Sequence, residues 1–289
     1  MTALAIPPAW QHLDLASLQG TIMVLGGTDT GKSTFARYLF LELCRLGRRV
    51  AYLDGDVGQS TLGLPATMTA ALCPPGGRPA FPPAGLRAVF FVGAVSPRGH
   101  MLPVVVGAHK LQAWACRQGA TEIVMDTTGM VDAAGGGGAL KQWKIELLAP
   151  ATLFALARGA ELEHILWPLR RRRDLRVREL AVAPAAREKV REARVAHRTD
   201  RFRRYFAGAG RLSVSLHRMP VTGLGGTIRG RLVAFQDKAS FVLGLGVVEK
   251  LDPGRGMLGV RTPLSDLDGV TSLRLGSLRL DPASGQQIG

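Results

Sequence analysis

Short apolar runs alternate with helical patterns over the first half of the chain. Strands are predicted at residues 21–25, 50–53, 89–92, 123–125 and 152–156, where apolar and β-branched residues cluster between polar or glycine-rich stretches. Residues 33–46, 111–117 and 140–148 carry apolar side chains at helical spacing. This alternation predicts an α/β fold with a mainly parallel sheet flanked by helices.

The pattern changes after residue 183. Residues 184–206 predict a basic helix with few large apolar side chains, which we expect to lie outside any core. Beyond it, short alternating runs are separated by glycine-rich turns, which is typical of a small β-rich domain. We therefore expect a short N-terminal segment (1–20), a main domain (21–210) that includes the Arg-rich segment at about 184–206, and a C-terminal β-rich domain (211–289).

The net charge indicates which class of partner the protein binds. The chain has 37 Lys and Arg against 22 acidic residues, a net charge of +15. The segment 158–204 alone holds 15 basic and seven acidic residues. Most of the basic residues are arginine, whose planar fork suits phosphate groups, so a nucleic-acid or polyphosphate partner is favoured over scattered surface charge.

The positions of the cysteines and the hydropathy of the chain indicate in which cellular compartment the protein resides. The three cysteines lie far apart, at positions 44, 73 and 116, and form no metal-binding pair. No apolar run approaches the roughly 20 residues of a membrane-spanning helix. The first ten residues carry Pro7 and Pro8 and no basic stretch, unlike a signal peptide. These features predict a cytoplasmic protein that is not bound to a membrane.

The strongest motif is a complete G-x-x-x-x-G-K-S between a predicted strand and a predicted helix, the context that a P-loop requires. Its glycines let successive N–H groups point at phosphate oxygens, and the helix N-terminus adds positive potential. Lys32 is expected to reach the β- and γ-phosphates of ATP or GTP, and the Ser33 hydroxyl is expected to bind Mg²⁺. The nucleotide-binding residues expected are Gly26, Gly27, Thr28, Asp29, Thr30, Gly31, Lys32, Ser33 and Thr34.

Acidic residues end two further predicted strands. Asp54 and Asp56 follow the strand at 50–53, and Asp126 ends the strand at 123–125. The carboxyl ends of parallel strands meet at the ligand edge of such a sheet. One carboxylate can hold Mg²⁺ and another can accept a proton from an attacking hydroxyl. The sequence leaves open whether Asp56 or Asp126 is the closer metal ligand.

Three arginines recur at helical spacing within the basic segment. Arg187, Arg191 and Arg194 share one helix face, and Glu188 and Glu192 share the adjoining one. By itself this spacing favours an exposed helix with ion pairs over a functional site.

Taken together, these segments resemble the polynucleotide 5′-hydroxyl kinase family, which includes the RNA kinase subunit of the mRNA cleavage and polyadenylation machinery and the kinase of pre-ribosomal RNA processing. The P-loop with its acidic Asp29 is similar to the family's, and the resemblance runs from about residue 6 to about residue 280. The other similar segments are Asp54-Gly-Asp-Val-Gly-Gln59, the Gly-x-x-Ser-Pro loop around Ser96, the clasp from Thr127 to Val131, and the Arg187-x-x-x-Arg191 lid.

The resemblance implies transfer of the γ-phosphate of ATP to the 5′-hydroxyl end of RNA or DNA, with Mg²⁺ as cofactor. It implies that Asp56 orients the proton of the attacking hydroxyl, that Ser33 and Asp56 or Asp126 lie at the metal, and that Lys32 and the lid arginines stabilise the transferred phosphoryl group. The substrate-binding residues it implies are Asp54, Gln59, Ser96, Thr127, Thr128, Gly129 and Met130.

Two departures keep alternatives open. The family usually has Trp after the clasp glycine, where this chain has Met130. A silent ATP-binding scaffold in an RNA-processing complex is therefore an alternative. A P-loop GTPase is a second alternative, suggested by Asp126-Thr-Thr-Gly129, although no guanine-reading Asn/Thr-Lys-x-Asp motif occurs. Trp143 is a candidate to replace the missing tryptophan in stacking on the substrate base. Only about 20 residues precede the first strand, so Trp10 is a candidate for contacting adenine.

Overall fold

The computed structural model describes residues 6–74, 76, 79–183 and 190–288, which form two compact units. The first unit comprises Met1–Asp56, Thr69–Arg87 and Pro97–Lys189; the second comprises Val57–Met68, Ala88–Ser96 and Val190–Gly289. Within the described part of the chain, every helix is too short or too polar to traverse a bilayer.

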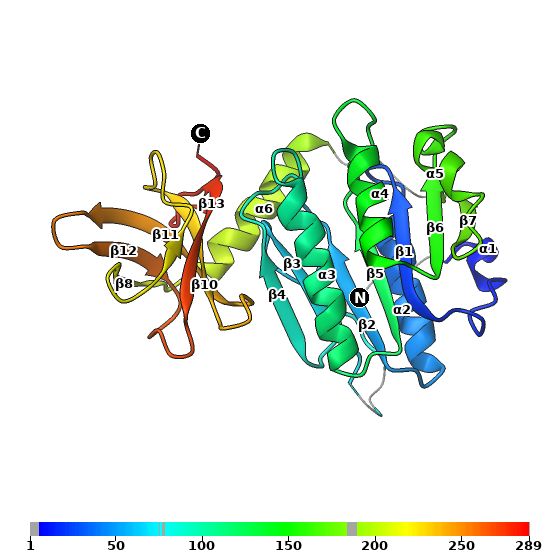
Figure 1. The fold of residues 1–289 in the computed structure, drawn as a ribbon, viewed down its shortest axis with the longest axis horizontal. Coiled ribbons are helices and arrows are strands. Elements are labelled where there is room, and N and C mark those ends of the chain that lie inside the picture. Colours follow the sequence, from blue (N-terminus) through cyan, green and yellow to red (C-terminus); the bar gives the residue numbers. More distant parts are fainter. Residues whose placement is uncertain (1–5, 75, 77–78, 184–189, 289) are drawn as a thin grey trace. The chain divides into compact units, whose positions relative to one another are not determined.

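A seven-stranded sheet has the strand order β4-β3-β2-β5-β1-β6-β7 (Figure 1), and most of its strands belong to the first unit. The pairs β2–β5, β5–β1, β1–β6 and β6–β7 are parallel, whereas β2 and β3 are antiparallel. The predicted mainly parallel α/β sheet is therefore confirmed. The strands are β1 (Gly20–Gly26), β2 (Val50–Gly55), β3 (Thr67–Leu72), β4 (Arg87–Phe91), β5 (Glu122–Thr127), β6 (Thr152–Ala157) and β7 (Arg176–Ala181).

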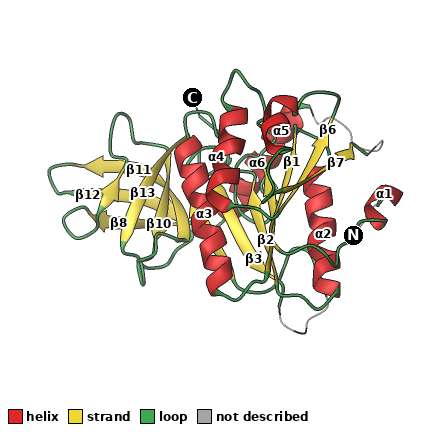
Figure 2. Ribbon diagram, turned by 45° about the vertical axis from the view of Figure 1, so that its right-hand side comes forward, coloured by secondary structure: helices red, strands yellow, loops and turns green. Residues whose placement is uncertain are grey.

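Helices cover both faces of this sheet (Figure 2). α3 and α4 pack against each other on one face, and α2 covers the other, where it contacts β1, β2 and β5. Because both faces are covered, strands β1, β2 and β5 are buried almost throughout. The helices are α1 (Pro8–Gln11), α2 (Lys32–Arg45), α3 (Met101–Arg117), α4 (Gly137–Leu148) and α5 (Glu163–Leu169).

The second unit is built on a six-stranded sheet in the order β8-β12-β11-β10-β13-β9. Its strand pairs are antiparallel except β13–β9. The predicted second, C-terminal sheet is thus confirmed, while the boundary at residues 210/211 stays a prediction. The elements are α6 (Arg191–Tyr205), β8 (Gly210–Ser215), β9 (Val221–Thr222), β10 (Arg231–Gln236), β11 (Val242–Asp252), β12 (Met257–Thr262) and β13 (Ser272–Arg279).

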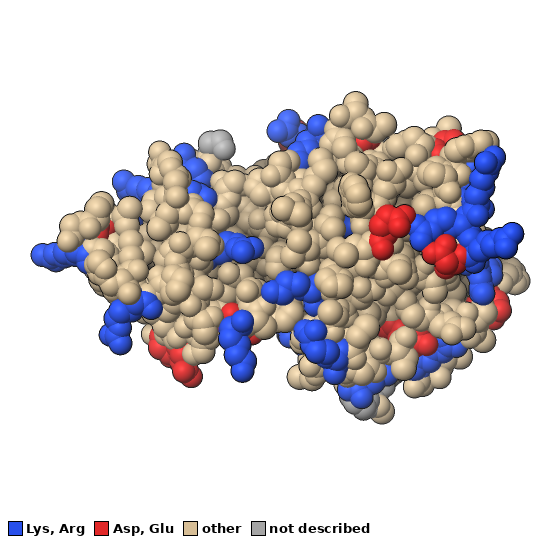
Figure 3. All heavy atoms as spheres, viewed as in Figure 1, with Lys and Arg blue, Asp and Glu red and all other residues tan. Residues whose placement is uncertain are grey.

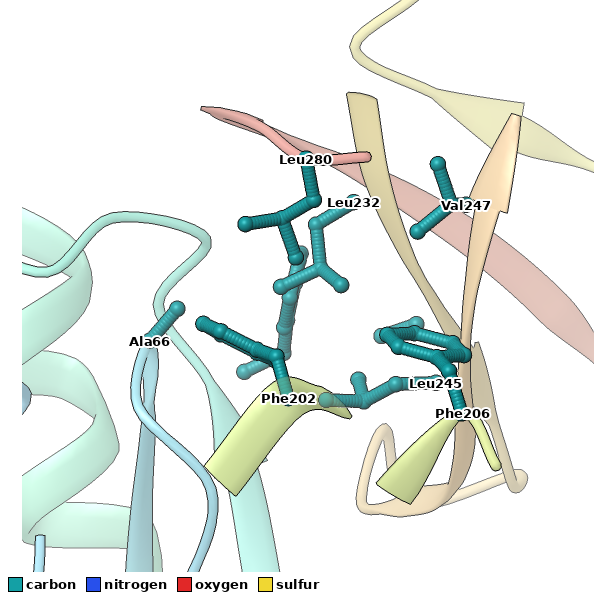
Figure 4. Close-up of a cluster of buried hydrophobic side chains, with 9 residues drawn as sticks. Ala66, Phe202, Phe206, Leu232, Leu245, Val247 and Leu280 are labelled. Atoms are coloured by element: carbon teal, nitrogen blue, oxygen red, sulfur yellow. The ribbon is translucent and has the colours of Figure 1, made fainter. Parts of the chain in front are cut away.

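One expectation about the basic helix is wrong. Helix α6 carries six arginines on a mostly exposed surface, but its C-terminal end enters the core of the second unit. Phe202 is fully buried and Phe206 is 4% exposed, and both pack against Leu232, Leu245 and neighbouring apolar side chains (Figure 4). Two aromatic rings one turn apart are therefore enough to anchor an otherwise polar helix.

Candidate active site

The G-x-x-x-x-G-K-S segment forms a tight loop between β1 and α2. Asp29 has φ 57° and Gly31 has φ 85°, the left-handed conformations that let the backbone curl around an anion. A Cβ on Gly26 would lie 2.4 Å from Thr30 Oγ1 and 2.8 Å from the Leu156 carbonyl oxygen, so only glycine fits there. Lys32 is 5% exposed and donates from Nζ to the Gly27 carbonyl at 3.2 Å. The loop has the geometry of a phosphate cradle.

A neighbouring loop holds this cradle in place. Arg158, at the end of β6, donates from its guanidinium to the carbonyl oxygens of Thr28 and Asp29 at 3.2 Å and 2.8 Å. Glu161 in turn accepts from the Arg158 N–H at 2.8 Å, and its carboxylate would lie 2.6 Å from a Cβ on Gly27. Arg158 was not predicted from the sequence, because a single arginine after a strand forms no recognisable motif.

The three acidic residues gather where β2 and β5 end. Asp54 and Asp126 are opposite each other in the strand register, and they are 0% and 1% exposed. Asp54 Oδ1 accepts from the Asp56 backbone N–H at 3.2 Å, and Asp56 itself is only half-buried. The sequence prediction that these carboxylates meet at one edge of the sheet is correct for all three.

The pKa of Asp126 is raised to about 7, chiefly by burial and also by the charges of Asp54 and Asp56, against the opposing effects of the Lys32 charge and a hydrogen bond with Ser33. Oδ2 accepts from the Tyr52 hydroxyl at 3.4 Å. Oδ1 is buried without a hydrogen-bond partner among the described residues. A buried carboxylate oxygen without a hydrogen-bond partner is stabilised by a proton or by a bound cation.

Mg²⁺ fits this site. No group of three or more His, Cys, Asp or Glu arranged to hold a metal occurs in the described ranges of the chain. Mg²⁺ does not require such a cage, because it is commonly bound by one or two carboxylates together with nucleotide phosphates and water. The Ser33 hydroxyl and the free oxygen of Asp126 are donors of this kind.

The segment after β5 lies directly against the phosphate-binding loop. A Cβ on Gly129 would be 2.7–2.9 Å from the Oγ1, Cα and N atoms of Thr28. Thr127 and Thr128 are buried, and the Thr127 hydroxyl donates to the Val24 carbonyl at 2.9 Å. Met130 is half-buried, and its N–H donates to Thr128 Oγ1 at 3.3 Å. Gly129 thus permits a backbone contact that any larger residue would block.

Two lysines that the sequence analysis did not single out lie beneath this segment. Lys141 and Lys144 of α4 are both fully buried. Lys141 Nζ donates to Thr127 Oγ1 at 3.1 Å and to the Thr128 carbonyl at 2.5 Å. Lys141 and Lys144 lie on the same buried helix face as Leu140, Ile145 and Leu148. Because lysine is rarely fully buried, two lysines at the apolar positions of a predicted helix could have been recognised as unusual from the sequence.

Burial also alters the ionisation of both lysines. It lowers the pKa of Lys141 well below the ordinary value, and the Lys144 and Lys32 charges lower it further. Burial lowers the pKa of Lys144 to about 8, opposed by attraction to Asp56 and Asp126. Lys144 Nζ has no hydrogen-bond partner in the described part of the structure. The edge of the sheet therefore holds a compact set of buried carboxyl and amino groups.

The two tryptophans considered as stacking platforms differ in exposure. Trp10 is 2% exposed, with its ring edge-on to Phe35 at 4.9 Å and its carbonyl accepting from the Tyr38 hydroxyl at 3.1 Å. It fills the core beside α2, so its surface is not open to adenine. Trp143 is 67% exposed on α4 and is free to contact a ligand.

The remaining expected residues belong to the second unit or lie outside the described residues. Arg187 is among the residues that the structure does not describe. Gln59, Ser96, Arg191 and Arg194 belong to the second unit, where Gln59 Nε2 donates to the Arg194 carbonyl at 3.4 Å. Arg191 begins α6 and is exposed. The approach of these side chains to the phosphates stays a prediction.

Comparison with known families gives one match that covers most of the chain. Residues 26–208 match the family model described as mRNA cleavage and polyadenylation factor CLP1 P-loop. The chain is 27% identical to a polyribonucleotide 5′-hydroxyl-kinase of Methanocaldococcus jannaschii and 28% identical to one of Pyrococcus abyssi, in each case over 93% of this chain and 89% of the relative.

More distant relatives share parts of the chain or its fold. A segment of 49 residues is 51% identical to the polyribonucleotide 5′-hydroxyl-kinase Clp1 of Bos taurus, covering 17% of this chain. Clp1p in the solved complex of wild-type Clp1p and Pcf11p is similar in fold, with a TM-score of 0.66, 14% identity, and coverage of 91% of this chain and 75% of that one. At that identity the likeness shows the fold alone.

Proposed function

Since the chain belongs to the CLP1 P-loop family of mRNA cleavage and polyadenylation factors, we propose that it is a polynucleotide 5′-hydroxyl kinase that transfers the γ-phosphate of ATP to the 5′ end of RNA. The observation that carries the proposal is the meeting of Asp54, Asp56 and Asp126 beside the phosphate-binding loop. The names of the archaeal relatives favour RNA as the acceptor.

In this proposal the loop from Gly26 to Thr34 binds the phosphates of ATP, with Lys32 at the β- and γ-phosphates. Mg²⁺ is held by the Ser33 hydroxyl and Asp126, whose Oδ1 is unsatisfied and buried. When bound, the metal neutralises charge on the phosphate oxygens. Arg158 keeps the loop backbone fixed through the Thr28 and Asp29 carbonyls.

Asp56 accepts the proton of the attacking 5′-hydroxyl. Asp54 and Asp126 are buried, whereas Asp56 is half-buried, so of the three carboxylates Asp56 is the one that a substrate can reach. Asp54 positions it by accepting its backbone N–H at 3.2 Å. A carboxylate within hydrogen-bond reach of the hydroxyl is the geometry that general-base catalysis requires.

The lid arginines Arg187, Arg191 and Arg194 act with Lys32 on the phosphoryl group in transfer. Phosphoryl transfer needs little covalent chemistry from the protein, so positive charge placed at the transferred group supplies most of the catalysis. The hydrogen bond from Gln59 to the Arg194 carbonyl supports a role for Gln59 in orienting the start of α6.

The 5′-terminal nucleotide contacts the clasp from Thr127 to Met130, together with Ser96. Because Thr127 and Thr128 are buried, their share in binding comes through backbone groups, while Met130 offers a polarizable side chain to the base. Met130 also favours a second candidate function, an ATP-binding scaffold without transfer, since it replaces the stacking tryptophan.

The test is transfer of γ-³²P from ATP to 5′-hydroxyl oligoribonucleotides and oligodeoxyribonucleotides of one sequence. We expect label on the RNA, loss of labelling in Lys32→Ala, Asp56→Asn and Arg191→Ala, and weaker labelling of DNA. ATP binding measured by calorimetry without acceptor separates loss of transfer from loss of folding in Asp56→Asn and Arg191→Ala, and circular dichroism does so for Lys32→Ala, which is expected to lose ATP binding as well. ATP binding by the wild type without transfer to either polymer would favour the scaffold.

A further inference from the structure

A hollow of about 1010 Å³ lies on the sheet of the second unit. It is bounded by strands β8, β11 and β12, by Arg229 and Gly230, and by the C-terminal segment at 279–288. None of the residues assigned above to phosphate transfer lines it. Basic side chains project along the face of the molecule drawn in Figure 3, with fewer acidic ones among them.

The floor of the hollow is made of small residues. Ser213 of β8 is paired in register with Gly259 of β12. Their neighbours Val214, Leu258 and Val260 are buried on the other face of the sheet, in its apolar core. A Cβ on Gly259 would lie 3.0 Å from Lys250 Cγ, so the glycine makes room for the stem of the Lys250 side chain along the hollow.

The sides of the hollow carry adjacent positive charges, which destabilise the sheet. Arg211 and Arg261 are directly paired across β8 and β12, an arrangement that is destabilising for like charges. Glu249 accepts from both, with distances of 2.8 Å to Arg211 and 2.9 Å to Arg261. It lies at an irregularity in β11, where the register with β12 shifts between Val248 and Lys250. One carboxylate therefore pairs with two guanidinium groups, so this group of three side chains keeps a net positive charge.

The rim adds more positive charge. Arg229 and Lys250 are exposed, and Arg279 donates from Nε to the Arg229 carbonyl at 3.3 Å. Among the lining residues, the only acidic residue besides Glu249 is Asp281, whose carboxylate accepts from Ser284 and from the Ala283 N–H. Five basic side chains thus face two acidic ones, both already engaged.

We propose that this hollow binds the sugar–phosphate backbone of a single-stranded polynucleotide. Arginine forks suit phosphate oxygens, and the volume lies at the upper limit of ordinary small-molecule pockets. None of the described lining residues is aromatic, so base stacking is absent and binding is independent of sequence. We identify the bound strand with the RNA whose 5′ end is phosphorylated, and this identification rests on the proposed function.

The test compares two double variants of the full chain. Arg229→Ala/Lys250→Ala removes two rim charges, and Arg255→Ala/Lys238→Ala removes two exposed charges of the same unit that do not line the hollow. Binding of a 3′-fluorescein 5′-hydroxyl oligouridylate is measured by anisotropy over a range of KCl, without ATP. We expect several-fold weaker binding in the rim variant only, and a salt slope shallower by roughly 0.7 for each lost phosphate contact.

Equal affinity and equal salt slope in the two double variants would overturn the proposal. So would a polyglutamate peptide that binds the wild type more tightly than RNA and loses binding in the rim variant, which would indicate an acidic protein partner. Rim-dependent RNA binding by a wild type that transfers no phosphate would support the hollow and contradict the kinase, so the two failures are distinguishable.

Discussion

Asp54 and Asp126 lie directly opposite each other on the parallel strands β2 and β5, and both carboxylates are buried. Two adjacent buried negative charges repel each other strongly in a low-dielectric site. The sheet places positive groups around them, with Lys32 and Lys144 both interacting electrostatically with Asp126. This edge of the sheet can therefore bind a cation together with the negatively charged phosphates of a nucleotide.

Asp126→Asn is expected to abolish the metal dependence of ATP binding. The amide keeps the shape of the side chain but removes the charge that attracts Mg²⁺. Calorimetry should show an ATP affinity without Mg²⁺ close to that of the wild type, but no gain on adding Mg²⁺. Phosphate transfer should fall roughly a hundredfold or more, because the metal supplies several kcal/mol of charge stabilisation. A normal gain with Mg²⁺ in this variant would exclude Asp126 as the ligand.

Lys141→Met is expected to impair RNA binding more than ATP binding. Lys141 holds the start of the clasp through Thr127 Oγ1 and the Thr128 carbonyl, and its removal leaves that buried carbonyl unsatisfied. We expect the KM for RNA to rise roughly tenfold, with the KM for ATP changed much less. Gln142→Met, on the exposed side of the same helix, is the matched control. Equal effects on both substrates would contradict a role specific to the clasp.

Gly129→Ala is expected to weaken nucleotide binding. The added Cβ would lie within 3 Å of the Thr28 backbone, so the clasp and the phosphate-binding loop must separate. Strain of this kind costs about 1–3 kcal/mol, which corresponds to roughly tenfold or more in ATP affinity. Gly225→Ala, where an added Cβ meets nothing within 4 Å, should leave affinity and stability unchanged. An unchanged ATP affinity in the Gly129 variant would show that the contact is not needed.

Lys144→Met is expected to stabilise the nucleotide-free protein near neutral pH. Burial lowers the pKa of Lys144 from 10.5 to about 8, a difference that corresponds to roughly 3 kcal/mol. Below pH 8 both folded and unfolded chains carry the proton, so the cost of the buried charge is fully present. Between pH 8 and 10.5 the unfolded chain binds the proton that the folded chain has lost, so wild-type stability rises with pH.

The gain from Lys144→Met in free energy of unfolding should therefore be largest near pH 7 and should shrink toward pH 10, as measured by urea denaturation. Lys238→Met, at an exposed lysine, should show no such trend. A gain that stays constant across this range would indicate a packing effect instead of a charge effect.

Much of the sheet was predictable because its strands are buried on both faces and therefore appear as apolar runs. β3 and β7 had no prediction. β3 is rich in Thr and Ala, and β7 carries charges along the sheet edge, so neither has the expected pattern. α3 begins at Met101, ten residues before the predicted start, since Pro103 and Gly107 obscure the helical pattern of its first half.

The candidate site was predictable where chemistry depends on short motifs. The phosphate-binding loop and the three carboxylates are each local in sequence, and the fold needed only to align the ends of β1, β2 and β5. Arg158, Lys141 and Lys144 act through contacts with segments that are distant in sequence or through burial. A single sequence does not reveal such contacts until the fold places their partners.

The most direct test of the kinase is to identify the product. The wild-type protein is incubated with ATP, Mg²⁺ and a 5′-hydroxyl RNA, and the RNA is then digested to mononucleotides and analysed by mass spectrometry. The account predicts one added phosphoryl group, found only on the 5′-terminal nucleotide, with one ADP formed for each. Unmodified RNA, with ATP either intact or hydrolysed to ADP and inorganic phosphate, would contradict it.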